Sequence, residues 1–207
     1  MCDFKVVKSA GEGEIIEKKS RFIAHVMPVN SEQEASDFIE KTKKKYWDAR
    51  HNCSAFVIGQ NNELTRCSDD GEPSGTAGRP MLEVLLGEGI HNVCVVVTRY
   101  FGGVLLGTGG LVRAYQAAVK EGLQACSVAT VHVGIKYQII IEYTDLTPMQ
   151  KMFEKNDYHT ENIEYSDKVS IIGIFSPAKE QEAIDNVTSL TNGKAVITKI
   201  GECEYIS

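Results

Sequence analysis

The chain has 207 residues, of which 43% are hydrophobic and 24% are charged, and this composition excludes general disorder. No run approaches the roughly 20 apolar residues that span a bilayer, and the N-terminus lacks a signal-peptide segment, so we expect a cytoplasmic protein without a membrane partner. The net charge of −6 argues against a polyanion binder that acts through overall charge. The six cysteines show neither CxxC pairs nor zinc spacing with histidine, which is typical of a reducing compartment.

The N-terminal stretch predicts a strand hairpin and then a helix. Two apolar stretches flank a turn that we expect at Gly11–Gly13. Ser31 and Glu34 form the S-x-x-E pattern of a capping box, and apolar residues recur behind them at helical spacing. The lysines at 41 and 43–45 crowd the last turns of this helix, where they complement its dipole, and we interpret them as a solvated helix end.

Short strands and a turn-rich segment follow in the middle of the chain. The apolar run 93–98 predicts a deeply buried strand. Turn formers are dense across 68–80 (SDDGEPSGTAGRP), and a loop rich in glycine spans 99–110. The other elements expected here are strands over 53–59 and 64–67 and helices over 81–86 and 111–126.

The chain from residue 131 onward predicts a second set of strands and helices. Alternation predicts a strand over 131–143, and Thr147–Pro148 predicts a helix with proline at its first position. The later elements are strands over 160–165, 168–175 and 195–200, with a helix between Ser176–Pro177 and Asn192–Gly193. The order β-α-β-β-α-β is that of a ferredoxin-like domain. We therefore expect an α+β protein with domains at 1–130 and 131–207.

The strongest candidate site is the glycine-rich loop between the buried strand and the next helix. Its glycines let backbone N–H groups approach a ligand, and the helix offers the positive end of its dipole. Arg99 precedes the loop and Arg113 lies one turn into the helix, so amides and guanidinium groups together could hold a phosphate or carboxylate. Residues 1–130 carry 15 Lys and Arg against 16 Asp and Glu, whereas 131–207 carry 7 against 12, which favours the first domain for an anion.

The loop matches neither G-x-x-x-x-G-K-[ST] nor a clean G-x-G-x-x-G, and the alternative interpretation is that its glycines serve tight turns and close helix–sheet packing. Tyr100 and Phe101 could stack on bases, although paired aromatic residues after a strand more often pack in a core. The residues that we predict for an anion- or nucleic-acid-binding surface are Arg50, His51, Arg79, Arg99, Tyr100, Gly102, Gly103, Gly107, Thr108, Gly109, Gly110 and Arg113.

Two other groups of side chains suggest chemistry. Asp69, Asp70 and Glu72 could hold a divalent cation or share a proton, but ordinary turn chemistry or pairing with an arginine explains them as well. His51 and Cys53 could form a thiol nucleophile with its base, but a packed cysteine beside a polar histidine is the simpler interpretation. We therefore assign no catalytic residue, no metal ligand and no cofactor.

Three long blocks resemble the signature blocks of the YigZ/IMPACT family. They are HNCSAFVIG at 51–59, SDDGEPSGTAGRPML at 68–82 and VVVTRYFGGVLLGTGGLVRAY at 95–115. The resemblance implies an N-terminal β-α sandwich of the type found in a ribosomal protein and the GHMP kinases. It also implies a C-terminal domain similar to the last domain of elongation factor G. Eukaryotic IMPACT proteins regulate translation through a protein partner and have an extra N-terminal domain, and we do not expect that specific partner to carry over to this chain.

We accordingly expect a non-enzymatic, translation-associated protein that binds structured RNA or a ribosome-linked partner. One alternative is an enzyme that acts on a phosphorylated small molecule, with the acidic cluster positioning Mg²⁺ and Arg99 or Arg113 clamping the phosphate. Another alternative is a regulatory module that binds a protein.

Overall fold

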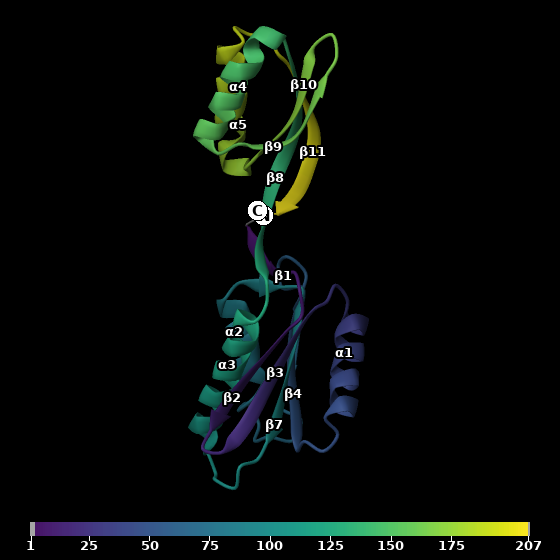
Figure 1. Cartoon of the computed structure of the whole chain (residues 1–207), viewed down its shortest axis with the longest axis vertical. Coiled ribbons are helices and arrows are strands. Elements are labelled where there is room, and N and C mark those ends of the chain that lie inside the picture. The colour runs from purple at the N-terminus through teal and green to yellow at the C-terminus, as the bar shows by residue number, and fades with distance from the viewer. Residues whose placement is uncertain (1–2, 207) are drawn as a thin grey trace. The chain divides into compact units, whose positions relative to one another are not determined.

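The computed structural model describes residues 3–206 and divides into two compact units (Figure 1). One unit comprises Phe4–Thr130, and the other comprises the chain from Val131 together with Asp3. Helices and strands occur in both units, which confirms the α+β class. No helix of the described chain is long and apolar enough to cross a membrane.

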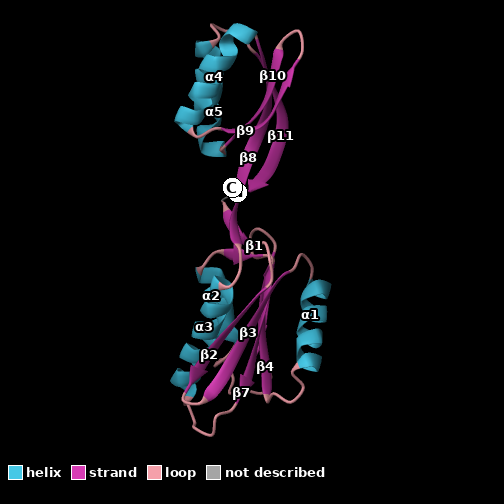
Figure 2. Ribbon diagram, viewed as in Figure 1, coloured by secondary structure: helices cyan, strands magenta, loops and turns pink. Residues whose placement is uncertain are grey.

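The first unit is built on a five-stranded antiparallel sheet between two helical layers (Figure 2). Its strands, in spatial order, are β2 (Gly11–Glu17), β3 (Ser20–Pro28), β7 (Val93–Tyr100), β4 (His51–Ile58) and β5 (Leu64–Ser68). Helices α2 (Gly78–Gly87) and α3 (Thr108–Gln124) cover one face, and α1 (Glu32–Lys45) covers the other. A short strand, β1 (Phe4–Val7), pairs in parallel with β6 (Ile90–His91).

Apolar side chains fill both spaces between the sheet and its helices. Under α2 and α3, Val97 and the ring of Phe22 are fully buried. Under α1, Val96 and Val29 form part of a smaller cluster. Because β7 is buried on both faces, it reads in the sequence as a continuous apolar run, and the buried strand predicted at 93–98 is confirmed.

The second unit contains two helices and an antiparallel sheet in which β11, β8, β10 and β9 are neighbours in that order. Its elements in chain order are β8 (Val128–Ile141), α4 (Tyr143–Asn156), β9 (His159–Tyr165), β10 (Val169–Phe175), a 3-10 turn η1 (Pro177–Lys179), α5 (Glu180–Leu190) and β11 (Val196–Ile206). The core contains Ile139 from the central strand and Phe153 from α4. The element order is the β-α-β-β-α-β order that periodicity predicted.

The turn expected at Gly11–Gly13 is wrong, because both glycines lie inside β2. A side chain on Gly13 would lie 2.6 Å from the backbone of Glu121 in α3, so this glycine allows the helix to pack closely on the strand. The hairpin turn falls instead at Lys18 and Lys19, whose φ angles are 45° and 68°. Lysine in this left-handed region gives no turn signal in a sequence.

Two boundaries in the second unit also differ from the prediction. Helix α4 begins at Tyr143, so Pro148 lies inside it rather than at its first position and removes one backbone hydrogen bond. The last strand extends from Val196 to Ile206 and pairs along most of β8, beyond the predicted 195–200. By contrast, the predicted cap of α1 is confirmed, because Ser31 Oγ accepts a hydrogen bond from Glu34 N at 3.2 Å.

Candidate binding surface at the glycine loop

Strand β7 ends at Tyr100, and an exposed loop leads from it to the start of α3. A Cβ on Gly102 would lie 2.0 Å from the carbonyl carbon of Lys19, so the loop packs directly against the β2–β3 turn. The amide of Gly102 donates a hydrogen bond to Ser20 Oγ at 3.2 Å. The loop and this turn lie at the same end of the unit (Figure 1). Close packing is thus one reason for the glycines.

The first turn of α3 has no side-chain cap. Its N-cap is Gly107, at φ 72°, and no side chain caps the amide groups of the first turn. Thr108 and Gly109 are exposed. Uncapped N–H groups at a helix start carry positive partial charge and bind anions. Arg113 is also exposed, and in the described chain no acidic side chain forms an ion pair with it.

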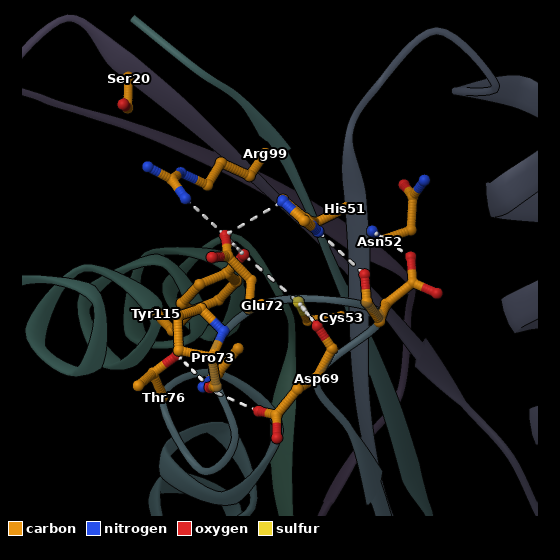
Figure 3. A network of polar contacts seen from close by, with 12 residues as sticks. Ser20, His51, Asn52, Cys53, Asp69, Glu72, Pro73, Thr76, Arg99 and Tyr115 are labelled. Atoms are coloured by element: carbon orange, nitrogen blue, oxygen red, sulfur yellow. Dashed lines mark hydrogen bonds and ion pairs between the residues drawn. The ribbon is translucent and has the colours of Figure 1, made fainter. Parts of the chain in front are cut away.

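Arg99, in contrast, is held inside a polar network (Figure 3). Its Nη1 donates to Glu72 Oε1 at 2.6 Å, and the hydroxyl of Tyr115 donates to the same oxygen at 2.9 Å. The Arg99 and Glu72 side chains are 7% and 3% exposed. The guanidinium also lies over the rings of Phe22 and Phe101, at 5.4 and 5.6 Å from their centroids. Through Glu72, Arg99 therefore joins β7 to the turn-rich segment 68–80 and to Tyr115 of α3, and it is not a free cation at the surface.

The two aspartates of the acidic cluster contact donors other than Arg99. Asp69 accepts hydrogen bonds from the backbone N–H groups of Gly75, Ala77 and Gly78, which brings its carboxylate to the start of α2. Burial alone would raise the pKa of Asp69, but these donors outweigh it and hold the pKa below its ordinary value. Asp70 contacts Lys43 Nζ at 2.6 Å.

The acidic cluster therefore has a structural role, and its Glu72 pairs with an arginine, which was one of the interpretations that the sequence allowed. Each of the three carboxylates has its own donors, so they do not form a shared set of oxygens. Within residues 3–206, no group of three or more His, Cys, Asp or Glu side chains is placed to hold a metal ion. The arrangement gives no support to the alternative in which Asp69, Asp70 and Glu72 position Mg²⁺.

Cys53 is packed as a small buried side chain. Its Sγ lies 3.0 Å from the carbonyl oxygen of Asp69 and 3.3 Å from the hydroxyl of Tyr115. Burial raises the pKa of the Cys53 thiol to about 12, so the thiolate does not form at neutral pH. His51 directs Nδ1 at the carbonyl oxygen of Asp70, at 2.9 Å. The geometry favours the packed-cysteine interpretation over the nucleophile.

The remaining predicted residues are distributed over the same unit. Arg50 is exposed, and in the β4–β7 register His51 lies opposite Arg99. Tyr100 donates its hydroxyl to Asp48 at 2.9 Å. Arg79 is exposed on α2 and forms an ion pair with a glutamate one turn along that helix.

Sequence reasoning missed four residues of this region. Lys18 and Lys19 are exposed at the turn that packs on Gly102, and within residues 3–206 neither forms an ion pair. Ser20 anchors the loop, and Tyr115 is fully buried in the network. Their only sequence signal was a Lys-Lys-Ser triplet between two strands and a tyrosine on the apolar face of a helix.

Comparison with known proteins shows which family this chain belongs to. The model of the Impact N-terminal domain matches residues 18–123, which include the glycine loop and the buried network. A second model, described as Domain of unknown function (DUF1949), matches residues 139–194.

Similar proteins extend over most of the chain. IMPACT family member YvyE of Bacillus subtilis is 46% identical over 97% of this chain and 92% of its own length. IMPACT family member YigZ of Escherichia coli is 35% identical over 89% of this chain and 92% of its own length. A crystal structure of a hypothetical protein has 33% identity and a TM-score of 0.61, and it covers 97% of this chain and 98% of that chain. The chain therefore belongs to the IMPACT family.

Proposed function

We propose that this chain is a cytoplasmic, translation-associated binding protein that holds structured RNA on a surface at the start of α3. The observation that carries the proposal is the uncapped first turn of α3 beside exposed cations that have no acidic partner in the described chain. We call this the glycine-loop surface, and it consists of Lys18, Lys19, Gly102, Gly103, Gly107–Gly110 and Arg113. Family membership supports the connection with translation, because the eukaryotic IMPACT proteins that the chain resembles regulate it.

Local charge supports an anionic partner although the chain is acidic. Backbone amides at a helix start and the guanidinium of Arg113 are donors of the kind that phosphate groups use in nucleic acids. Screening limits interactions between exposed charges to about 8–10 Å at physiological salt, so distant carboxylates weaken such a site little. The acidic remainder of the chain favours a partner whose shape fits this surface over polyanions in general.

The buried network has a supporting role in this proposal. Arg99 contacts Glu72 of the segment 68–80 and the ring of Phe101 at the start of the glycine loop. At Phe101 the chain passes from β7 into the binding surface. A fixed loop loses less conformational entropy when it binds. We therefore leave Arg99 out of the contacts with RNA and assign it the positioning of the loop.

We also propose fold relationships that fit this function. The first unit would be a β-α sandwich of the ribosomal-protein type, and the second a ferredoxin-like domain, as the resemblance implies. Both types occur in translation factors. Fold alone does not determine function, so the binding surface has to be tested on its own residues.

The test is filter binding of purified ribosomal RNA between about 50 and 300 mM salt. A site that contacts about three phosphates gives a slope of log K against log salt near −2 to −3. The variant Arg113→Ala should lower the affinity several-fold and reduce that slope by about one. Lys151→Ala, which removes one exposed charge from α4 of the second unit, is the matched control and should change neither.

Two results would count against the proposal. Negligible binding that does not change with salt would remove RNA as the partner. Equal losses in Arg113→Ala and Lys151→Ala would show that the affinity is not local to the glycine-loop surface. A partner that co-purifies equally well after nuclease treatment would instead favour the alternative of a protein-binding module.

A further inference from the structure

The face of the first sheet that carries α1 has a groove beside that helix, on the opposite side of the sheet from α2 and α3. Helix α1 contacts β4 and β7, which leaves the side of this face toward β2 and β3 open. The groove has a volume of about 330 Å³ and is lined by parts of β2, β3 and α1. It involves none of the residues of the glycine-loop surface, so the inference does not depend on the proposed function.

The groove is apolar inside and charged at its rim. Met27 and Phe38 provide apolar lining, and Lys41 and Lys45 line it from α1. Val26 also borders the groove, but its side chain packs under α3 on the other face of the sheet. Pockets for small ligands have this composition, with mostly apolar walls and a few polar groups that fix orientation, and their volumes begin near roughly 300 Å³.

The acidic group at the groove already has a partner. Glu12 Oε2 lies 3.0 Å from Nδ1 of His25, whose side chain is 8% exposed. The other ring nitrogen of His25 lies 3.4 Å from Thr98 Oγ1, and the ring stacks on Tyr46 at a centroid distance of 4.7 Å. These contacts fix the imidazole and bring the carboxylate of Glu12 to it. Because burial lowers the pKa of His25, the imidazole is neutral at neutral pH and the carboxylate keeps its charge, so the anionic group of a ligand would have to lie on the lysine side of the groove.

The lysines of the rim are not committed in the same way. Lys41 has no ion pair within residues 3–206, and Lys45 places its ammonium group 4.8 Å from the centroid of the Tyr46 ring. Their spacing of four residues brings both to one side of α1. The other lysines of this helix end differ, because Lys43 contacts Asp70 and Lys44 contacts Glu40. A hydrogen bond with Tyr46 and, to a smaller extent, the charge of Glu12 raise the pKa of Lys45, so the groove combines two ammonium groups with one carboxylate and has a net positive charge.

We propose that this groove binds a small amphipathic anion. Its apolar body would lie against Met27 and Phe38, and its carboxylate or phosphate would lie between the ammonium groups of Lys41 and Lys45. Two ammonium groups at one rim favour an anion, and an apolar lining favours a hydrocarbon or aromatic body over a sugar. The lysines at the end of α1 thus have a binding role beyond a solvated helix end.

The test compares octanoate, octanol and octylammonium, which share an alkyl chain and differ in charge. Binding to the full chain is measured by isothermal titration calorimetry. Octanoate should bind saturably in the millimolar range or tighter, octanol more weakly, and octylammonium at least about tenfold more weakly than octanoate. 1-Naphthoate, a second anion, tests whether an aromatic body is accepted.

Three single variants locate the site. Ala10→Phe adds a ring at an exposed position of the groove lining and should abolish binding. Lys41→Gln and Lys45→Gln should each weaken octanoate about three- to tenfold and leave octanol unchanged. Lys44→Gln removes the same charge from the same helix outside the groove and is the control.

The proposal is overturned if neither octanoate nor 1-naphthoate binds saturably, or if the three octyl compounds bind equally. It is also overturned if Ala10→Phe binds octanoate as well as the natural chain does, or if Lys44→Gln weakens binding as much as Lys41→Gln. Circular dichroism of each variant confirms that the comparison is between folded proteins. None of these outcomes depends on whether the chain binds RNA.

Discussion

Replacing Glu72 with glutamine removes the carboxylate that pairs with Arg99 and keeps nearly the same side-chain volume. The two side chains are 7% and 3% exposed, so water cannot replace the lost partner without opening the structure. Nε of Arg99 already lies buried without a hydrogen-bond partner. The glutamine carbonyl could still accept a hydrogen bond from Nη1, but it carries no charge, so the guanidinium would be left as a buried cation without an ion-pair partner beside its cation–π contacts with Phe22 and Phe101.

The expected loss of stability follows from this burial. Removing one partner of a buried ion pair costs about 3–5 kcal/mol, because the remaining charge is left uncompensated. The amide carbonyl that Glu72→Gln introduces can still accept from Tyr115, so that hydrogen bond is not added to the cost. For a unit of this size, 1 kcal/mol corresponds to roughly 3–5 °C, and we expect the Tm of the first unit to fall by about 10–25 °C.

Differential scanning calorimetry of the full chain measures this shift. The control is Glu83→Gln, which removes an exposed partner of Arg79 and should cost less than about 1 kcal/mol. In Glu72→Met with Arg99→Met the buried charge is absent, so the double variant should recover much of the loss. A loss below about 1 kcal/mol in Glu72→Gln would refute the reasoning, since it would mean that the pair does not hold the unit together.

Three further predictions test other parts of the fold. Gly102→Ala should cost about 1–3 kcal/mol by urea unfolding, because its Cβ would lie 2.0 Å from the backbone of Lys19, and a neutral result would contradict the packing of this loop. Burial lowers the pKa of His25 below 6.5 although a facing carboxylate opposes the shift, so the unfolded chain binds a proton that the folded chain does not. The contribution of His25 to the free energy of unfolding should therefore be fully present above about pH 6.5 and decrease as the pH falls below it. In His25→Gln, this part of the pH dependence should be flatter between about pH 7.5 and 5.5. Iodoacetamide at about pH 8 followed by mass spectrometry should label the exposed Cys67 well before the buried Cys53, whose thiol pKa is about 12, and equal rates would contradict the burial.

The regular elements could be predicted because local patterns determine them. The capping pattern at Ser31 predicts only a helix start, and the apolar run 93–98 predicts only a buried segment, so each local signal leads to one structure. Gly11 and Gly13 misled the prediction, because glycine serves a turn and a close helix contact equally well. The actual turn at Lys18–Lys19 uses residues that enter the left-handed region only because the flanking strands hold them there.

The candidate site could be predicted only in part. The loop itself, its glycines and the exposed Arg113 follow from the motif between a strand and a helix. The pairing of Arg99 with Glu72 does not follow from that motif, because the two residues lie 27 positions apart and local spacing does not predict such a contact. Pairing of β4 with β7 and the packing of α3 bring them together, and both are tertiary contacts.

The most direct measurement for the central claim is an NMR titration of the isotope-labelled full chain with a short structured RNA. The account predicts that the amide signals of Gly107, Gly109 and Gly110 move first and furthest, together with those of Lys18 and Lys19. It also predicts that phosphate ions at high concentration compete for the same amides. Saturable RNA binding that moved signals elsewhere and left these amides in place would contradict the assignment of the binding surface to the start of α3.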